Sequence, residues 1–567
     1  MYFVVAVIEQ GTYAVCGAQV DFASGTVTYE PEQQFSTEDF IAFVEATEPK
    51  HPRWVWADSN VIYARLHRLG LRVERCYDLR LNRAILRNSS WVTASFSPSV
   101  GMSADSVAEI SSWDVPPPAP SDALFTVNAV VVGDPFAEFS RQLTVLKSAG
   151  TPHWERLRML LAAESVGSLI AVEMTQAGVP WDIDIHNQLL VAELGPRPSQ
   201  GMRPARLEEL AAQIRRLLDS PHLNPDSPKD LLAALNQGGL PVSSTSKWEI
   251  QGLKHPVIPV LLDYKRRSRM LSANGWSWRD EWVSGGRFRP VYVPGGVVTG
   301  RWGADGGGAL QLPHFIRPAV VADPGWTFVL SDAAQLEPRV LAAMSGDQAM
   351  AQAGQGHDMY NGIKDAAKLE SRDHAKYGVL GAMYGGTTGV SAQVLPRFKV
   401  AFPQAMTMLE RAAQAGQTGR TVHTWLGRTS APGNFGSGTE GEDAQVVADR
   451  RQATRSYGRF TRNFIVQGSA AEWALVWMAL VRQELFTLTR DQGGIKTTDG
   501  PHLVFFLHDE ILIHTPVELA PTVVDIVQRS ATLAGELLFG SSPVEFSVSA
   551  HVNDTYTEPE PDSSDDD

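Results

Sequence analysis

The stretch from Leu503 to Thr515, LVFFLHDEILIHT, constrains the fold of this chain more than any other. Two strongly apolar, β-rich segments flank His508-Asp509-Glu510, which predicts a hairpin with buried strands and a rigid tip. Burying two adjacent carboxylates costs several kcal/mol unless they are paired or bound to a metal. A divalent cation at this tip is therefore one interpretation, and an exposed acidic turn is the other.

Length and composition indicate a soluble protein of several domains. Single hydrophobic cores stop growing at about 250 to 300 residues, so a chain of 567 residues predicts roughly three or four compact units. The content of 43% hydrophobic and 20% charged residues is ordinary for a globular protein, and no apolar run approaches the roughly 18 residues of a membrane span. The N-terminal MYFVVAVIEQ has no basic segment and no small-residue cleavage site, which predicts a first β-strand and a cytoplasmic protein.

The charge of the chain is unevenly distributed. The formal net charge of −14 argues weakly against a nucleic-acid partner, because phosphate binding draws on lysine and arginine. Part of the negative excess lies in residues 557–567, TEPEPDSSDDD, which we interpret as a disordered acidic tail. Basic residues gather elsewhere, for example from Tyr264 to Arg269, so the sequence also permits a positive groove on an acidic protein.

The N-terminal part of the chain predicts a small α/β domain. It covers residues 1 to about 155 and has strands near 2–8 and 13–20. The apolar spacing then becomes helical over residues 156–176, and this helix ends at residues 177–180, where glycine and proline follow one another. We expect a domain junction at that point.

A second acidic residue follows a buried strand. Residues 326–330, WTFVL, are a short apolar strand, and Asp332 comes directly after it at a predicted strand-to-helix turn. Aspartate is common at such a position because it caps the following helix. Taken alone, Asp332 is therefore interpreted as a capping residue.

Residues 372–386, RDHAKYGVLGAMYGG, carry a cationic, then apolar, then aromatic stripe along one slowly turning helical face. Such a stripe suits a ligand with phosphate and base, because cations bind phosphate and a flat apolar surface stacks on a base. A solvated basic face beside a core face is an equally weighted alternative. The members of the stripe are Arg372, Lys376, Leu380 and Tyr384.

Residues 459–472, RFTRNFIVQGSAAE, place Arg459, Asn463 and Gln467 on one helical face. All three side chains can donate hydrogen bonds, and the acceptors shared by every base pair face the minor groove. The stripe could therefore check the shape of a duplex without reading its sequence. An ordinary polar surface is again the alternative.

Together these segments resemble family A DNA polymerases, the DNA polymerase I type, over roughly residues 160–555. The segment DAAQLEPR at 332–339 resembles the first palm motif, and LHDE at 507–510 resembles the third. The order is closest to the short actinobacterial-type paralogues described as bifunctional 3′-5′ exonuclease/DNA polymerases, which lack a 5′-nuclease domain. Further segments in family order are Thr299-Gly300-Arg301, Leu310-Gln311 with Pro313, Gly427-Arg428 and Ala177 to Asp182.

This resemblance implies an α/β (α+β) fold. It is a right-hand polymerase with palm, fingers and thumb, preceded by an RNase H-like exonuclease-type domain. The implied bounds are 1–155 for a degenerate 3′-5′ exonuclease-like domain, 156–556 for the polymerase domain, about 183–290 for the thumb, about 291–345 and 431–556 for the palm, and about 346–430 for the fingers.

The resemblance also implies a reaction, namely template-directed addition of dNTPs to a primer 3′-hydroxyl by two-metal-ion transfer, in DNA repair or gap filling. The implied partners are primer-template DNA and dNTPs, with two Mg²⁺ ions that Mn²⁺ can replace, for a monomer in the nucleoid with no membrane contact. The implied catalytic residues are Asp332 and Asp509, which also hold the metals, with Glu510 and Lys376. The implied dNTP contacts are Arg372, Lys376, Leu380, Tyr384, Gln335 and Glu337, and the implied DNA contacts are Arg301, Arg459, Asn463, Gln467 and His508.

Three positions depart from the family pattern. Ala333 stands where the family usually has Tyr, Pro338 where it has Leu, and Leu380 where it has Phe or Tyr. Stacking of an aromatic ring on a base is worth about 1 to 3 kcal/mol, and leucine lacks the π-face. We therefore expect activity with weaker dNTP binding and resistance to dideoxynucleotides. The alternatives are an inert primer-template scaffold and a single-subunit RNA polymerase, against which Glu337 argues, because its bulk in the family blocks a ribose 2′-hydroxyl.

The exonuclease motifs of the resembled family are incomplete here. Such a proofreading domain holds two metals through an Asp-x-Glu pair on its first strand and further aspartates. In this chain the first strand reads VVAVIEQG, and Asn60-Val-Ile-Tyr63 is followed by Ala64 in place of an aspartate. We therefore predict a preserved domain without proofreading activity. A rearranged site that uses Glu9, Asp58 and Asp78 is the alternative.

Overall fold

The protein is described by a computed structural model whose described residues form two compact units. The first unit contains Met1–Ala177, Tyr292–Ala304 and Val329–Val552, and the second contains Gly178–Val291, Asp305–Phe328 and Asn553–Asp567. Apart from Thr557, the acidic tail expected at 557–567 lies outside the described residues. The described residues are 1–9, 11–96, 133–308, 310, 312–356, 358–386, 389–435, 444–493 and 496–557.

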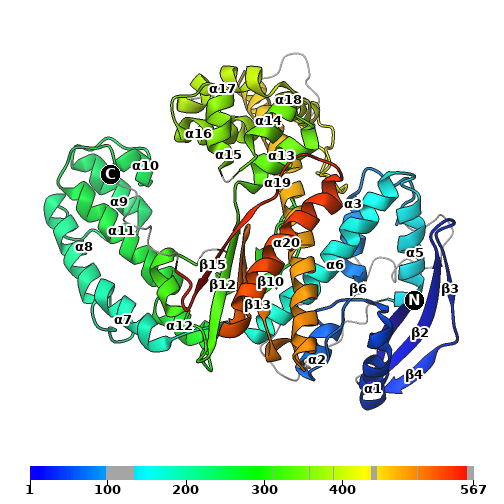
Figure 1. Ribbon diagram of the computed structural model, residues 1–567. Helices are drawn as coiled ribbons and strands as arrows, with labels where there is room; N and C mark the ends of the chain where they lie inside the picture. The colour runs from blue at the N-terminus through cyan, green and yellow to red at the C-terminus, as the bar shows by residue number, and fades with distance from the viewer. Residues whose placement is uncertain are drawn as a thin grey trace. The chain divides into compact units, whose positions relative to one another are not determined.

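The first unit begins with a mixed β-sheet of order β3-β2-β1-β5-β6, in which β4 also pairs with β2 (Figure 1). β1 is antiparallel to β2 but parallel to β5, which is parallel to β6. The strands predicted near residues 2–8 and 13–20 are confirmed as β1 and β2. The bounds are β1 (Tyr2–Glu9), β2 (Thr12–Asp21), β3 (Thr26–Tyr29), β4 (Gln33–Ser36), β5 (Arg53–Trp56) and β6 (Cys76–Asp78).

Helices cover this sheet and close its core. Trp54 and Trp56 of β5 are fully buried and belong to one apolar cluster with Phe40, Tyr63 and Leu169, which come from three of these helices. The helix predicted over residues 156–176 is confirmed, and the border between the two units falls directly after it. The bounds are α1 (Thr37–Thr47), α2 (Ile62–Arg68), α3 (Leu79–Asn88), α5 (Pro135–Lys147) and α6 (His153–Ala177).

The second sheet of the first unit has the order β13-β14-β12-β15. The hairpin predicted from residues 503–515 is confirmed, because β13 and β14 pair antiparallel and Leu507 pairs with Glu510 across a two-residue turn. His508 in this turn has φ 62°, a positive φ that tight hairpin turns favour. The bounds are β12 (Trp326–Ala333), β13 (His502–Leu507), β14 (Glu510–Pro516) and β15 (Val548–Asn553).

Asp332 lies inside β12 and not at the start of a helix. The strand continues past Leu330 to Ala333, and the N-cap of the helix that follows, α13, is Gln335. The interpretation of Asp332 as a capping residue is therefore wrong. The error has a local cause, since the apolar run ends at Leu330 while the backbone pairing of the strand continues.

Long helices run along one side of this sheet. α6, α19 (Ala444–Asp491) and α20 (Ala520–Phe539) contact β13 or β14 and lie beside one another (Figure 1). By length and composition α19 alone among the described helices could cross a membrane, but 78% of its most apolar window is buried inside the protein. Trp473 and Trp477 on α19 stack on one another and are fully buried. These features are those of a core helix.

Further helices connect β12 to α19, and a small hairpin braces the β13–β14 hairpin. The hairpin consists of β10 (Tyr292–Val293) and β11 (Gly303–Ala304), and its Tyr292 hydroxyl donates to the Phe506 carbonyl at 3.1 Å and accepts from the Phe506 N–H at 3.0 Å. The connecting helices are α13 (Leu336–Ser345), α14 (Gln348–Ala353), α15 (Met359–Ala366), α16 (Arg372–Tyr384), α17 (Gly389–Ala401) and α18 (Pro403–Gln417).

The second unit is mainly helical around its own apolar core. The basic run from Tyr264 to Arg269 lies on its helix α11, where Arg266 and Arg267 form ion pairs with Glu193 and Asp263. The bounds are β7 (Val179–Pro180), α7 (Ile183–Leu194), α8 (Ala205–Leu217), α9 (Pro228–Gln237), α10 (Lys247–Ile250), α11 (Val257–Asn274), α12 (Trp276–Trp282), β8 (Val283–Ser284) and β9 (Arg287–Phe288).

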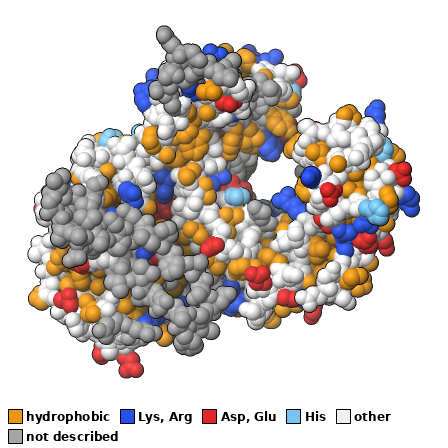
Figure 2. Space-filling view, turned by 180° about the vertical axis from the view of Figure 1, so that it is seen from behind, with side chains coloured by type: hydrophobic (Ala, Val, Ile, Leu, Met, Phe, Trp, Pro, Cys, Tyr) orange, Lys and Arg blue, Asp and Glu red, His pale blue; other side chains and the backbone are white. Residues whose placement is uncertain are grey.

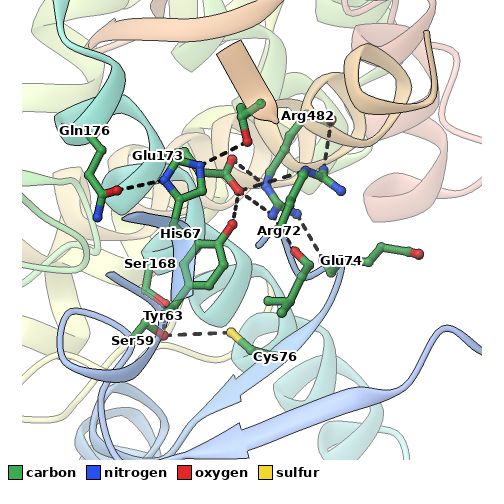
Figure 3. Close-up of polar contacts among 12 residues, drawn as sticks. Ser59, Tyr63, His67, Arg72, Glu74, Cys76, Ser168, Glu173, Gln176 and Arg482 are labelled. Atoms are coloured by element: carbon green, nitrogen blue, oxygen red, sulfur yellow. Dashed lines mark hydrogen bonds and ion pairs between the residues drawn. The ribbon is translucent and has the colours of Figure 1, made fainter. Parts of the chain in front are cut away.

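A buried ion pair joins the N-terminal region to the long helices of the first unit (Figure 3). Arg482 of α19 donates to the Glu173 carboxylate of α6, from Nε at 2.8 Å and from Nη2 at 2.6 Å. The Tyr63 hydroxyl of α2 donates to the same carboxylate. Arg482 also donates to the backbone oxygens of Val73 and Glu74. Segments far apart in sequence therefore share one buried charge pair.

The neighbouring cations keep Glu173 ionised. Burial alone raises the pKa of Glu173, but Arg482 and then Arg72 lower it to about 2. In an unfolded chain the pKa of glutamate is about 4.3. The Arg482–Glu173 ion pair therefore makes its full contribution to the stability of the fold above that pH. The contribution is lost as the pH falls toward about 2.

We predict that Arg482→Met destabilises the protein by about 3 to 5 kcal/mol, because it leaves the buried Glu173 charge without its main partner. The free energy of unfolding in urea at pH 7 measures the effect. Arg490→Met is the matched control, since Arg490 is an exposed arginine on the same helix and should change stability by less than about 0.5 kcal/mol. Equal losses in the two variants would contradict a stabilising role of the ion pair.

Candidate active site

Two aspartates lie at one edge of the β13-β14-β12-β15 sheet, Asp332 near the end of β12 and Asp509 in the turn between β13 and β14. The Ala333 N–H donates to the Asp509 carbonyl at 3.1 Å, which fixes the end of β12 against the tip of the β13–β14 hairpin. The side chain of Asp332, one residue before Ala333, is exposed, and Asp509 is half-buried at the tip. Glu510 is the first residue of β14 and is also half-buried. The structure thus places the two aspartates that the sequence singled out on adjoining segments of backbone.

The surroundings of Asp509 suit a bound cation. Burial raises the pKa of Asp509, and His508 and Arg301 only partly oppose this shift. Among the described residues no group of three or more His, Cys, Asp or Glu side chains forms a ready-made metal cage. Mg²⁺ is typically held by one or two carboxylates plus water and substrate phosphates. The carboxylates of Asp332, which is exposed, and of Asp509, which is half-buried, fit that manner of binding.

A polar cluster adjoins the aspartates. Arg301 donates to Glu337 Oε1, and the Tyr384 hydroxyl donates to Glu337 Oε2 at 3.2 Å. Gln467 hydrogen-bonds the Tyr384 side chain. Burial raises the pKa of Glu337, Arg301 and Tyr384 oppose this, and Asp509 adds to it, so Glu337 lies within electrostatic reach of the aspartate. One cluster therefore contains Arg301 of the Thr299-Gly300-Arg301 segment and Glu337 of the 332–339 segment. It also contains one residue from each helical stripe, Tyr384 of α16 and Gln467 of α19.

The stripe on α19 continues from this cluster. Arg459 packs against the C-terminal end of α16, where its Cγ lies 2.7 Å from the point at which a Cβ on Gly385 would stand. Asn463 is half-buried, and its side-chain oxygen has no hydrogen-bond partner among the described residues. His508 is exposed at the hairpin tip, where burial and Arg301 lower its pKa and Asp509 partly opposes them.

The cationic stripe on α16 (Arg372–Tyr384) is only partly open to a ligand. Arg372 Nε donates to Asp358 Oδ2 at 2.6 Å, and its guanidinium lies over the Tyr360 ring at 5.3 Å from the centroid. Lys376 is exposed and Leu380 is half-buried one turn further along the helix. Sequence reasoning missed Asp358 and Tyr360, because Asp358 shows only the signal of a helix N-cap.

Two other members of the first palm motif serve the packing of the region. The Gln335 side-chain oxygen accepts from the Met359 N–H at 3.2 Å, so it is turned toward the start of α15. Arg339 is fully buried and donates to the backbone oxygens of Gly354 at 2.8 Å and Glu545 at 2.6 Å. Gln311, which belongs to another segment of the resemblance, lies outside the described residues.

Comparison with known proteins identifies the family. A sequence model of DNA polymerase family A matches residues 200–558, which is more than half of the chain. The chain belongs to DNA polymerase family A. DNA polymerase I of Chloroflexus aurantiacus is 26% identical over 360 residues, which cover 58% of this chain and 35% of that protein. The thermostable DNA polymerase I of Thermus aquaticus is 26% identical over 387 residues, which cover 61% of this chain and 42% of that protein.

The region shared with these two relatives is less than half of their length. Among solved structures, the fold of this family A chain resembles that of the POL domain of Pol1 from M. smegmatis, solved in complex with DNA primer-template and dNTP. The TM-score is 0.67 at 19% identity, and the match covers 98% of this chain and 95% of that one. This likeness shows the fold of the chain.

We predict that Gly385→Ala disturbs the junction of α16 and α19. Gly385 has φ 72°, and an added Cβ would also meet Arg459, whereas Gly389 has φ 63° and open space around it. The left-handed conformation costs an alanine about 1 to 2 kcal/mol at either position, and only Gly385→Ala adds a steric clash. Thermal unfolding should therefore show a larger loss for Gly385→Ala than for the control Gly389→Ala. Equal losses of thermal stability in the two variants would show that the Arg459 side chain moves aside at no cost.

Proposed function

We propose that this chain is a template-directed DNA polymerase that adds dNTPs to a primer 3′-hydroxyl. The observation that carries the proposal is the backbone contact that sets Asp332 of β12 against Asp509 in the turn of the β13–β14 hairpin, within electrostatic reach of the Arg301–Glu337–Tyr384 cluster. The family supports the same function, as does a fold neighbour solved with primer-template and dNTP. DNA repair or gap filling, a monomeric state and a nucleoid location belong to the same proposal.

Asp332 and Asp509 are the residues that would hold two Mg²⁺ ions. Bound there, the ions, or Mn²⁺ in their place, would activate the primer hydroxyl and stabilise the leaving pyrophosphate. Glu510 adds a third carboxylate to the negative field at this edge of the sheet. The resulting chemistry is in-line transfer, in which positioning and electrostatic stabilisation do most of the work.

The residues of α16 (Arg372–Tyr384) bind the incoming nucleotide. Lys376 is exposed and offers its ammonium group to the triphosphate, while Arg372 must leave or share its ion pair with Asp358 in order to join it. Leu380 gives the base and sugar an apolar surface without a π-face. Tyr384 holds Glu337, whose carboxylate fills the space that a ribose 2′-hydroxyl would need.

The duplex lies against a row of hydrogen-bond donors. Gln467 contacts Tyr384, and Asn463 and Arg459 follow at intervals of one helical turn along α19, so these side chains can meet minor-groove acceptors that do not depend on sequence. Arg301 and His508 lie within electrostatic reach of Asp509, where they would contact the primer end.

We predict that Asp332→Ala and Asp509→Ala each abolish primer extension in Mg²⁺ with four dNTPs. Binding of a primer-template duplex, measured by fluorescence anisotropy, should remain within about threefold of the wild type, because the donor row is intact. Glu536→Ala, which removes an exposed carboxylate from α20, is the control and should extend normally. If the protein is an inert scaffold, the wild type itself should bind the duplex without extending the primer. Primer extension by either aspartate variant would contradict the proposed mechanism.

We predict that Glu337→Ala relaxes the choice of sugar. Removing the carboxylate opens space beside Tyr384 and frees Arg301, so incorporation of rNTPs should rise by at least about tenfold relative to dNTPs. Ratios of kcat/KM for a matched dNTP and rNTP pair measure this. Glu536→Ala, which removes an exposed carboxylate from α20, is again the control. Equal use of both sugars by the wild type would instead favour an RNA polymerase.

We also propose that residues 1–155 form an RNase H-like domain without proofreading activity. The mixed sheet order β3-β2-β1-β5-β6 supports the fold. Asp58 and Asp78 do not form an open site, because Asp78 accepts from the Ser59 and Leu81 N–H groups and Asp58 accepts from the Asn60 N–H. Both aspartates are buried, which argues against their use in a rearranged metal site.

We predict that a 3′-mismatched primer stays intact when it is incubated with the protein and Mg²⁺ or Mn²⁺ without dNTPs. The physical reason is that two cations cannot be held close together without a cluster of carboxylates. Gel analysis of a 5′-labelled primer measures any shortening. Shortening that persists in the Asp332→Ala, Asp509→Ala double variant would overturn the proposal, since that variant removes the polymerase site but not the N-terminal domain.

A further inference from the structure

The carboxylate of Asp358 has two separate tasks at the start of α15 (Met359–Ala366). Its Oδ1 accepts from the Tyr360 N–H at 2.8 Å and from the Asn361 N–H at 3.3 Å, which makes Asp358 the N-cap of this helix. Its Oδ2 accepts from Arg372 Nε at 2.6 Å. The ion pair can therefore open without uncapping α15, because different oxygens serve the helix and the arginine.

This ion pair lies beside the candidate active site. The Arg372 guanidinium lies over the Tyr360 ring, so the ring and Asp358 hold it from two sides. Burial raises the pKa of Tyr360 to about 12, and smaller effects of Glu337 and Asp509 act in the same direction, whereas Arg372 opposes them. The Tyr360 side chain is therefore within electrostatic reach of both carboxylates of the site, and it places Arg372 on the same side of α16.

Charge pairing by itself is ordinary on this protein. Figure 2 shows Lys and Arg side chains close to Asp and Glu side chains at several places on the visible face. One such surface pair joins Lys399 to Glu410 at 2.9 Å. What distinguishes the pair of Asp358 with Arg372 is its arginine, because the proposed function assigns Arg372 to the triphosphate of the incoming nucleotide.

The two cations of the stripe on α16 differ in how free they are. Lys376 is exposed and forms no ion pair with any residue that the structure describes. Arg372, one turn earlier, is exposed as well, but its Nε–H is already used by Asp358. Carboxylate and phosphate oxygens are equivalent acceptors for a guanidinium group. A bound triphosphate therefore takes Lys376 directly and must compete for Arg372.

We propose that Asp358 is an internal competitor of the triphosphate for Arg372 and thereby lowers the affinity of the site for all four dNTPs alike. The inference rests on the proposed polymerase function and deepens it by naming a residue that regulates nucleotide binding. The competition does not depend on the base, because Arg372 would contact only phosphate. Asp358 acts through Arg372, so it is a positioning residue and not a catalytic one.

The test measures dNTP binding by the full-length Asp358→Asn variant on a primer-template. Asparagine still caps a helix, but it lacks the charge that holds Arg372. The Kd of the next dNTP is measured with a primer that ends in a dideoxynucleotide and cannot be extended, and kcat is measured with an ordinary primer. The Kd should fall by about two- to fivefold, the range expected for one partly exposed ion pair. The factor should be the same for each dNTP on its matching template, and kcat should stay within about twofold of the wild type.

Three further variants make the outcome specific. In an Arg372→Ala background, Asp358→Asn should leave the Kd unchanged, because the arginine for which Asp358 competes is gone. Asp358→Glu keeps the negative charge and should restore a Kd close to that of the wild type. Asp365→Asn removes an exposed carboxylate from the other end of α15 and should not alter the Kd.

An unchanged or higher Kd in Asp358→Asn would overturn the proposal. So would a gain that persists in the Arg372→Ala background, that appears with only one base, or that Asp365→Asn reproduces. Primer extension by the wild type is measured in parallel. Absence of extension would contradict the polymerase function, whereas normal extension with an unchanged Kd in Asp358→Asn would contradict only the competition for Arg372.

Discussion

The hydrogen bond from the Ala333 N–H to the Asp509 carbonyl fixes the geometry on which the candidate site depends. It joins β12 to the two-residue turn of the β13–β14 hairpin, so backbone pairing fixes the positions of the two aspartates in the chain relative to one another. The turn leaves little freedom, because it contains a left-handed residue, His508, and Tyr292 braces the adjoining strand through both polar groups of Phe506. The polar side chains of α16 and α19 then pack beside a hairpin turn whose conformation is already fixed.

Local patterns in the sequence were sufficient for the main elements of this arrangement. The apolar runs on either side of His508-Asp509-Glu510 predict the hairpin, and spacing by four residues predicts the helical faces of α16 and α19. Asp332 shows the limit of such patterns. Its strand is extended by pairing with β14, and hydrogen bonds between strands leave no mark in the residues that follow an apolar run.

Contacts between distant residues could not be predicted in the same way. Arg372 meets Asp358, Arg301 meets Glu337, and Arg482 meets Glu173, which lies 309 positions away in sequence. Each partner is one of many acidic residues in the chain, and the choice among them is made by packing of whole helices. A basic run is equally ambiguous from sequence, since only the fold shows that Arg266 and Arg267 are neutralised by acidic neighbours.

α19 is long enough to connect the N-terminal region to the polar row of the candidate site. The helix has 48 residues and no proline, and at 1.5 Å per residue it is about 72 Å long. Arg482, near one end, is bound to Glu173 and to the backbone after α2, whereas Gln467 stands beside Tyr384 about 23 Å away along the axis. The N-terminal region therefore holds one end of α19, and the part of the same helix that packs on α16 and α18 bears the polar row. Loss of those contacts would loosen this end of α19 without altering any residue at the aspartates, so a change in the N-terminal region can reach the polar row through the helix even where that region performs no chemistry.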